Sequence, residues 1–383
     1  MSKLISQGGF GCVYYPGIKC DGSKDSRRNV VTKLQRKNPT AENEIYIGEL
    51  IKRIPNYRMF FLPVIDSCPV NIRDVDSELI TDCKVVASSG DLPFILMTIP
   101  YVSNRGFFET LTDFSLGKKQ ILLTITETYS YLLSAIKYLL DANVVHFDLK
   151  GENVLYNLVS TDPQIIDFGI SLPISKVTPG TWRQYFYAYA PEYYVWPLEV
   201  HLINFLLHES SPLKKSDIPD IASRFTKNNK ALEPFSADFR EKYQSLCEVC
   251  LQTYIGKPKE QVIPLLVKQH PSWDNYSLSA LYLRTFSYMF PKNLHRNPVL
   301  IQFSQLLLLN LSPDFSTRLS LDETKKKFSG IFFSQGDVAS YRDLVDTLDY
   351  DSVAITRRIK EDIQTLRTAH KSASHPATLS GTS

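Results

Sequence analysis

The sequence lacks the features that mark several classes of protein. No apolar run reaches the roughly 20 residues that a membrane-spanning helix needs, and the first residues, Met-Ser-Lys-Leu-Ile-Ser-Gln, carry no apolar signal core. Basic residues exceed acidic ones only slightly, 43 against 40, so charge does not indicate a nucleic-acid or membrane partner. No G-x-x-x-x-G-K-[ST] string is present, which argues against a P-loop nucleotide site. We expect an intracellular, cytoplasmic, soluble protein without nucleic-acid or membrane partners.

Cysteine is also scarce, with 6 residues in a chain of 383. A chain of this length does not need a small-domain disulfide framework, so reduced thiols are expected. Cys247 and Cys250 form a single C-x-x-C without a second pair at zinc-site spacing. We interpret these two as cysteines on a helix face, with metal or redox use as the alternative.

What is present is enough apolar material for a large core, 43% of the residues. Short β-rich runs over 29–34 and 94–99 predict strands, and residues 41–54, bounded by prolines, predict one helix. From residue 118 the pattern becomes helical, and leucines, isoleucines and tyrosines at three- and four-residue spacing predict a buried helix over 121–141. The sequence therefore predicts a strand-dominated part followed by a helical part.

The second half contains a segment, about 201–272, with six prolines and mixed helical propensity, which we interpret as an insertion. Residues 282–311 and 338–366 again predict helix. Residues 370–383 are rich in Ser, Thr, Ala and Gly and predict a mobile tail.

The chain begins with a glycine-rich string, Ile-Ser-Gln-Gly-Gly-Phe-Gly-Cys-Val-Tyr over residues 5–14. Glycines let backbone N–H groups approach phosphate oxygens without a Cβ in the way. A glycine turn of purely structural origin fits this string equally well. The candidate nucleotide-binding residues in it are Ser6, Gly8, Gly9, Gly11 and Val13.

Lys33 lies on the strand predicted over 29–34, where its ammonium could reach the α- and β-phosphates of a nucleotide. Glu44 lies eleven residues later on the predicted helix, and its carboxylate could hold Lys33 in place. Glu49 is the competing partner, and a surface lysine without a role is the alternative for Lys33 itself.

The most specific string is His-Phe-Asp-Leu-Lys-Gly-Glu-Asn-Val-Leu-Tyr over residues 146–156, followed by Asp-Phe-Gly at 167–169. Phosphoryl transfer needs a carboxylate that accepts the substrate hydroxyl proton, a cation on the γ-phosphate and oxygen ligands for Mg²⁺. These roles fall in order to Asp148, to Lys150, and to the pair Asn153 and Asp167.

These strings resemble the eukaryotic protein kinase superfamily, whose signatures include H-R-D-L-x-x-x-N, D-F-G and A-P-E. Ala190-Pro191-Glu192 resembles A-P-E, and residues 274–279 resemble the helix whose aspartate steadies the catalytic loop. Arg318 resembles the late arginine that pairs with the A-P-E glutamate, so the resemblance implies an ion pair between Glu192 and Arg318. It covers roughly residues 4 to 330.

The resemblance implies an α+β, two-lobed kinase fold with a small β-rich N-lobe over 1–100 and a large helical C-lobe over 101–369. The insertion of about 201–272 precedes the helix of residues 274–279, and the tail covers 370–383. ATP and Mg²⁺ would bind between the lobes. The sequence carries no signal for an oligomeric state.

The resemblance also suggests the substrate and the adenine site. Lys150 within D-L-K-x-x-N is the form typical of members that phosphorylate serine or threonine in protein substrates. The adenine would lie between Val13 and Thr32 on one side and Leu155 on the other. The hinge would lie near residues 100–102, with Ile99 as gatekeeper.

The chain departs from the family at several positions. Ser6 replaces the first glycine of the loop, and Phe147 replaces the arginine that commonly pairs with a phosphorylated activation loop. Phe147 therefore predicts activity that is independent of loop phosphorylation. Gly180-Thr181 lies too far from residues 190–192 to assign a substrate-facing threonine.

The long segment between Glu192 and Asp274, together with the aromatic string after residue 192, resembles kinases encoded by large cytoplasmic DNA viruses. This resemblance would place the protein in the host cytoplasm or in the virus particle. The main hypothesis is an active serine/threonine protein kinase. The alternatives are an ATP-binding pseudokinase scaffold and a kinase of small metabolites or lipids.

Overall fold

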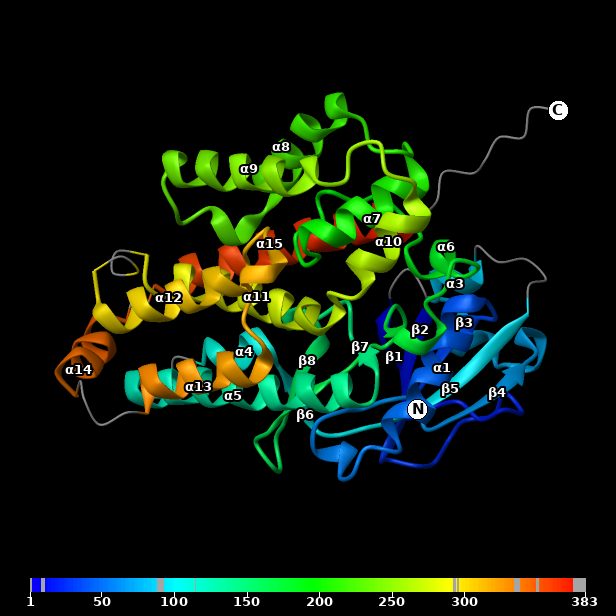
Figure 1. Ribbon diagram of the computed structural model, residues 1–383. Helices are drawn as coiled ribbons and strands as arrows, with labels where there is room; N and C mark the ends of the chain where they lie inside the picture. Colours follow the sequence, from blue (N-terminus) through cyan, green and yellow to red (C-terminus); the bar gives the residue numbers. More distant parts are fainter. Residues whose placement is uncertain are drawn as a thin grey trace.

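The computed structural model describes residues 2–7, 11–87, 93–113, 115–291, 294, 296–333, 338–348 and 351–374. A β-rich first part and a much larger helical part lie side by side (Figure 1). The predicted α+β, two-lobed kinase fold is confirmed.

The β-rich part is a five-stranded antiparallel sheet with the order β1-β2-β3-β5-β4. Two of the strands correspond to the predicted runs, and both are largely buried, as β-branched and other apolar residues favour. The strands are β1 Lys3–Gln7, β2 Gly11–Tyr15, β3 Val30–Arg36, β4 Asp66–Val70 and β5 Phe94–Pro100.

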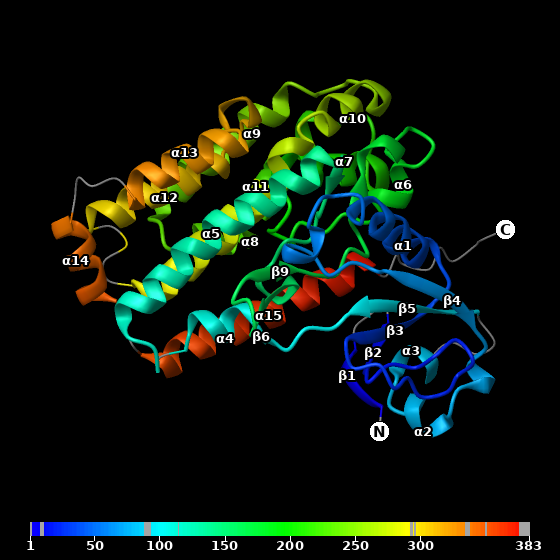
Figure 2. The ribbon, with the colours of Figure 1, turned by 90° about the horizontal axis from the view of Figure 1, so that it is seen from below.

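One helix of this part, α1 (Pro39–Ile51), packs against the sheet and faces the helical part (Figure 2). It begins where the Asn38 side chain accepts a hydrogen bond from the Ala41 N–H, with proline in the first turn, as helix starts favour. A Cβ on Gly48 would lie 2.3 Å from the Val64 carbonyl oxygen, so glycine permits this close approach. Two short helices, α2 (Ser77–Ile80) and α3 (Lys84–Ala87), cover the other side of the sheet.

The helical part is built around α5 (Lys118–Asp141), which contains the predicted 121–141 helix. Its buried positions recur every three or four residues, so one face packs into a single continuous core. The other helices are α4 Phe107–Leu111, α6 Trp182–Tyr185, α7 Leu198–His208, α8 Ile218–Asn228, α9 Ala237–Gln252, α10 Lys259–Val267, α11 Trp273–Met289, α12 Pro298–Asn310, α13 Leu321–Phe332, α14 Val338–Thr347 and α15 Ser352–Ser374.

Short strands lie where the two parts meet. These strands form a three-stranded sheet of order β6-β8-β9 and a two-stranded sheet of β10 and β7. The strands are β6 Asn104–Gly106, β7 Val144–Val145, β8 Val154–Asn157, β9 Pro163–Ile165 and β10 Leu172–Pro173. These strands fix the ends of the loops that carry the candidate catalytic residues.

The segment predicted as an insertion is helical, and α8 and α9 form the top of the molecule in Figure 1. It starts within α7, which already begins at Leu198. The stretch predicted as helix over 282–311 is divided between α11 and α12, and α12 starts anew at the Asn297 cap.

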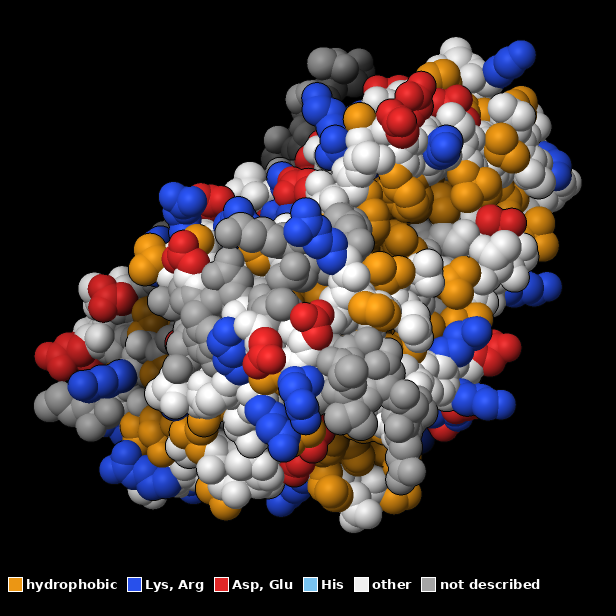
Figure 3. Space-filling model, turned by 90° about the vertical axis from the view of Figure 1, so that its left-hand side faces the viewer, with side chains coloured by type: hydrophobic (Ala, Val, Ile, Leu, Met, Phe, Trp, Pro, Cys, Tyr) orange, Lys and Arg blue, Asp and Glu red, His pale blue; other side chains and the backbone are white. Residues whose placement is uncertain are grey.

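An apolar hollow of about 500 Å³ lies between α9 and α12. Figure 3 shows hydrophobic side chains gathered beneath the helices at the top of the molecule on this side. The hollow is lined mainly by Phe239, Tyr243, Leu246, Leu308 and Leu309.

The helix predicted over 338–366 is also two helices, α14 and α15. Asp362 of α15 accepts two hydrogen bonds from Arg284 of α11, at 2.6 and 2.8 Å, and Arg367 donates to Glu152 Oε1 at 3.1 Å. In Figure 2, α15 runs beneath the helical part toward the β-rich part. The mobile tail predicted from residue 370 is wrong at its start, because α15 continues to Ser374, and residues 375–383 lie outside the described part.

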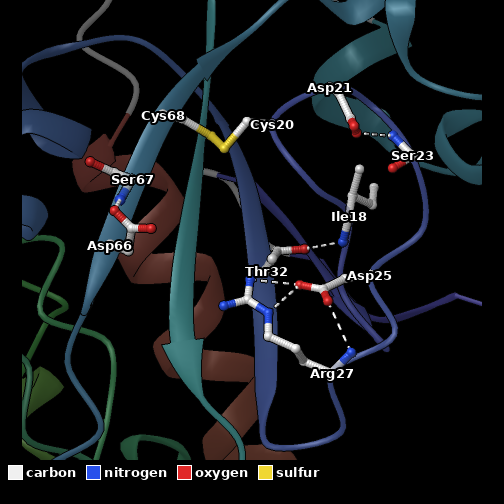
Figure 4. The surroundings of a disulfide bond; sticks show 10 residues. All are labelled: Ile18, Cys20, Asp21, Ser23, Asp25, Arg27, Thr32, Asp66, Ser67 and Cys68. Atoms are coloured by element: carbon white, nitrogen blue, oxygen red, sulfur yellow. Dashed lines mark hydrogen bonds and ion pairs between the residues drawn. A yellow bond between two sulfur atoms is a disulfide. The ribbon is translucent and has the colours of Figure 1, made fainter.

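The expectation of reduced thiols is also wrong for four of the six cysteines. Cys12 is bonded to Cys83 and Cys20 to Cys68 (Figure 4). Each bond joins the sheet or its edge loop to a segment 71 or 48 residues away, a proximity that spacing along the chain cannot reveal. Cys247 and Cys250 are free and lie on α9, as expected.

In the described ranges, no helix combines the length and the apolar character needed to cross a membrane.

Candidate active site

The site begins where Lys33 of β3 meets α1. Lys33 Nζ lies 2.7 Å from Glu44 Oε2 and 3.4 Å from Asp167 Oδ1. Both Lys33 and Glu44 are almost fully buried, whereas the Asp167 side chain is 44% exposed. The structure therefore brings together three residues that are 11 and 134 positions apart in the chain.

Electrostatics keep Lys33 charged. Burial alone would lower the pKa of its ammonium, but the carboxylates of Asp167 and Glu44 outweigh burial and hold the pKa above its usual value. Glu49, the competing partner, instead pairs with Lys52 at 2.5 Å on an exposed face. The geometry favours Glu44.

The segment after Asp167 is tied to α1 and to the core. Asn43 Nδ2 donates to the Ser171 carbonyl oxygen at 2.8 Å. Phe168 is 1% exposed, and its ring lies 5.1 Å from the ring of His146 and 6.2 Å from that of Phe61. With Phe168 packed in the core, the neighbouring Asp167 faces Lys33.

Asp148, Lys150 and Asn153 meet within one short loop. Lys150 Nζ lies 3.0 Å from each carboxylate oxygen of Asp148. Asn153 Nδ2 donates to Asp148 Oδ2 at 2.9 Å and to the Asp148 carbonyl oxygen at 2.8 Å. These bonds fix the Asp148 carboxylate between a cation and an amide.

Asp274 of α11 holds this loop from below, as the resemblance implied. Its carboxylate accepts the backbone N–H groups of His146 at 2.7 Å and Phe147 at 2.9 Å. Burial raises the pKa of the Asp274 carboxyl above its usual value, although His146 and these two N–H groups lower it in part. The bonds stabilise Phe147 at φ +68, a left-handed conformation that few side chains adopt.

Phe147 occupies a buried aromatic cluster in place of the family's arginine. Its ring stacks on Trp196 at 4.9 Å and lies 5.8 Å from Trp273 and 5.9 Å from Phe186. Trp196 Nε1 also donates to the Phe147 carbonyl oxygen at 2.8 Å. Packing and one hydrogen bond therefore hold the segment around Trp196 to the catalytic loop.

Two of the nucleotide-binding candidates, Val13 and Lys33, lie on one face of the sheet. Val13 pairs with Lys33 in the ladder between β2 and β3, so the two side chains share a face, while Leu155 lies on β8. A Cβ on Gly11 would lie 2.6 Å from the Leu34 carbonyl oxygen, so only glycine fits there. Ser6 lies on β1, whereas Gly8 and Gly9 lie outside the described residues.

Thr32 does not line this face, contrary to the expectation. Successive residues of a strand point to opposite faces, so Thr32 points away from Lys33. Its hydroxyl accepts the Ile18 N–H at 2.8 Å on the far side of the sheet (Figure 4). Val31 and its ladder partner Ile99 take the position on the Lys33 face.

The predicted ion pair between Glu192 and Arg318 is wrong. Arg318 instead makes two hydrogen bonds to Glu199, at 2.5 and 2.9 Å, with both side chains no more than 2% exposed. Glu192 lies 3.3 Å from Arg224, and both of these side chains are close to half exposed. Glu199 lies in the first turn of α7 and faces α11, whereas Glu192 lies in the preceding surface segment. Packing therefore selects Glu199.

Sequence reasoning missed two residues near the site. Glu199 closes the string Trp-Pro-Leu-Glu at 196–199, a second proline-containing string ending in glutamate that could have been weighed against residues 190–192. The Tyr193 hydroxyl donates a hydrogen bond to Asp148 Oδ1, and no pattern in the sequence predicts that contact.

Asn153 and Asp167 offer a donor set that suits Mg²⁺. Magnesium in kinase sites is held by one or two protein oxygen ligands together with substrate phosphates. Both N–H groups of the Asn153 amide are engaged, so its oxygen is the atom left for a metal, and Asp167 adds an exposed carboxylate. Among the described residues, no group of three His, Cys, Asp or Glu side chains could hold a metal by itself.

Comparison with protein families matches residues 72–255 to the family described as "Protein kinase domain". A 50-residue segment is 44% identical to mitogen-activated protein kinase kinase kinase 5 of Homo sapiens and of Mus musculus. It covers 13% of this chain but only 4% of those proteins.

Among solved structures, the autoinhibited serine kinase domain of the giant muscle protein titin matches with a TM-score of 0.46 and 13% identity, over 97% of this chain and 91% of that chain. A TM-score this low carries no weight in the assignment.

The family match includes the loop of Asp148 and the Asp-Phe-Gly string, which the geometry places opposite Lys33. This match supports the resemblance to the eukaryotic-type protein kinase superfamily.

Proposed function

We propose that the chain is an active protein kinase that transfers the γ-phosphate of ATP to serine or threonine hydroxyls of protein substrates. The observation that carries the proposal is the position of Lys33 Nζ, 2.7 Å from Glu44 and 3.4 Å from Asp167. In protein kinases this lysine and glutamate must pair, and the aspartate must be in place, for activity. A scaffold that had lost catalysis would have no need to maintain all three.

The residues divide the work as follows. Lys33 and Lys150 would neutralise charge on the phosphates, and Asp148 would orient the substrate hydroxyl and accept its proton. Asn153 and Asp167 would hold Mg²⁺, which supplies charge stabilisation at the phosphates when bound. Val13 and Leu155 would contact the adenine, and Ser6, Gly8, Gly9 and Gly11 the phosphates. Lys150, bonded to both oxygens of Asp148, supports the serine/threonine assignment.

The proposed division is an N-lobe over 1–100 and a C-lobe over 101–369, with the segment of about 201–272 as an insertion. That insertion, which contains α8, α9 and α10, supports the resemblance to kinases of large cytoplasmic DNA viruses. The protein would then act in the host cytoplasm or travel in the particle. The two disulfides favour the particle, because disulfides are rare in a reducing cytosol.

The test is transfer of radiolabelled phosphate from Mg-ATP to a generic basic protein, with phosphoamino-acid analysis of the product. Wild type should label serine or threonine, while Asp148→Asn and Asp167→Ala should not. Glu49→Gln, on the exposed face of α1, is the matched control for Glu44→Gln and should retain activity. ATP binding without any transfer by wild type would contradict the proposal and favour the pseudokinase scaffold.

A further inference from the structure

Tyr193 contacts the proposed catalytic base directly. Its side chain is fully buried, and its ring packs edge-on against Trp196 at 4.9 Å. The hydroxyl donates to Asp148 Oδ1, and Lys150 Nζ lies 3.4 Å from the same hydroxyl oxygen. A phenol therefore lies on the carboxylate that a substrate hydroxyl has to reach.

The Asp148 carboxylate has no acceptor position to spare. A carboxylate offers about four lone-pair sites. Oδ1 accepts from Tyr193 and from Lys150, and Oδ2 accepts from Lys150 at 3.0 Å and from Asn153 at 2.9 Å. Asp148 is only 3% exposed. One of these donors must leave before a substrate hydroxyl can bond to the carboxylate.

Tyr193 is the donor that can leave. Lys150 carries a charge, and Asn153 is also tied to the Asp148 backbone at 2.8 Å. Tyr193 is neutral: burial first, and then the neighbouring Asp148 charge, raise its pKa well above the usual value, so it stays a protonated donor. Losing a neutral donor costs the site less than losing the cation.

The segment that contains Tyr193 leaves some of its buried polar groups without hydrogen bonds in this conformation. The hydroxyls of Tyr187 and Tyr189 are buried without a hydrogen-bond partner, and each such group costs stability. The ion pair from Glu192 to Arg224 of α8 is close to half exposed and therefore weak. A rearrangement of residues 187–193 is thus within reach when a substrate binds.

We propose that Tyr193 is a gate on the catalytic base. Its hydroxyl occupies the position on Asp148 that the phosphoacceptor hydroxyl of a protein substrate must take, and the substrate displaces it to react. This inference rests on the proposed kinase function.

The test compares Tyr193→Phe with Tyr14→Phe in the full chain, using phosphate transfer to a serine-containing basic peptide. Tyr193→Phe should raise kcat/KM about tenfold, the equivalent of about 1.4 kcal/mol for one hydrogen bond to a charged group. Tyr14→Phe removes a buried hydroxyl without a partner on β2, outside residues 187–193, and should leave kcat/KM unchanged. Thermal unfolding is measured for both variants to check that each one folds.

Each outcome is decisive. If Tyr193→Phe lowers kcat with KM unchanged, the tyrosine positions the base, and the gate is overturned. Equal activity of Tyr193→Phe and wild type also overturns it. In both cases active wild type leaves the kinase proposal standing. If wild type is silent and Tyr193→Phe transfers phosphate, and adding Asp148→Asn abolishes the transfer, the gate is supported and the proposal that the wild-type chain is active fails. If neither transfers phosphate while both bind ATP, both fail.

Discussion

Two glutamates seven residues apart give the sharpest test of the structure. Glu199 forms the buried pair with Arg318, and Glu192 forms the half-exposed pair with Arg224. The sequence motif assigns the structural role to Glu192, whereas the structure assigns it to Glu199. Replacing each glutamate by alanine separates the two assignments.

The expected costs differ widely. Glu199→Ala would leave the Arg318 charge buried and would also remove the acceptor of Trp273 Nε1, which lies 3.0 Å from Glu199. Removing one partner of a buried pair costs about 3–5 kcal/mol of unfolding free energy. Glu192→Ala breaks an ion pair close to half exposed, which is worth about 0–1 kcal/mol.

The assay is equilibrium unfolding in urea, with the free energy extrapolated to water and the slope checked for each variant. Glu199→Leu combined with Arg318→Met is expected to recover part of the loss, because an apolar pair leaves no buried charge. A larger loss for Glu192→Ala than for Glu199→Ala would refute the reasoning and restore the motif-based pair.

Three further predictions concern pH, phosphorylation and redox state. Burial lowers the pKa of His201 to about 4, so the unfolded chain binds its proton first as pH falls below the ordinary value near 6.5. Unfolding free energy should therefore fall by up to about 1.4 kcal/mol per pH unit over that window, and His201→Leu should show a shallower pH dependence in calorimetry. Phe147 offers no cation to a phosphate, so phosphatase treatment should leave transfer activity unchanged, and loss restored by rephosphorylation would contradict this. Reducing the two disulfides should lower the unfolding free energy by about 2–4 kcal/mol each, and a melting temperature unaffected by dithiothreitol would argue against them.

The sequence by itself determined the elements whose residues are close along the chain. Asp148, Lys150 and Asn153 lie within six positions, so the loop that contains them brings them together, and the spacing was sufficient to identify the loop. The pair of Lys33 and Glu44 spans one strand and the start of the next helix, and it was also within reach of pattern reasoning. The order of a β-rich part before a helical part followed from hydrophobic periodicity.

Tertiary structure decided the choices among equivalent local candidates. Glu192 and Glu199 both end proline-containing strings, and only the packing of α7 against α11 buries the second. Strand register determines which face of the sheet the Thr32 side chain lies on, and a shift of one residue moves it to the opposite face. Partners such as Cys12 with Cys83, or Tyr193 with Asp148, are 71 and 45 positions apart. Residues this distant meet only because the chain packs into hydrophobic cores, one at the sheet that contains Cys12 and Cys83 and a larger one that contains Tyr193. Local sequence carries no record of that proximity.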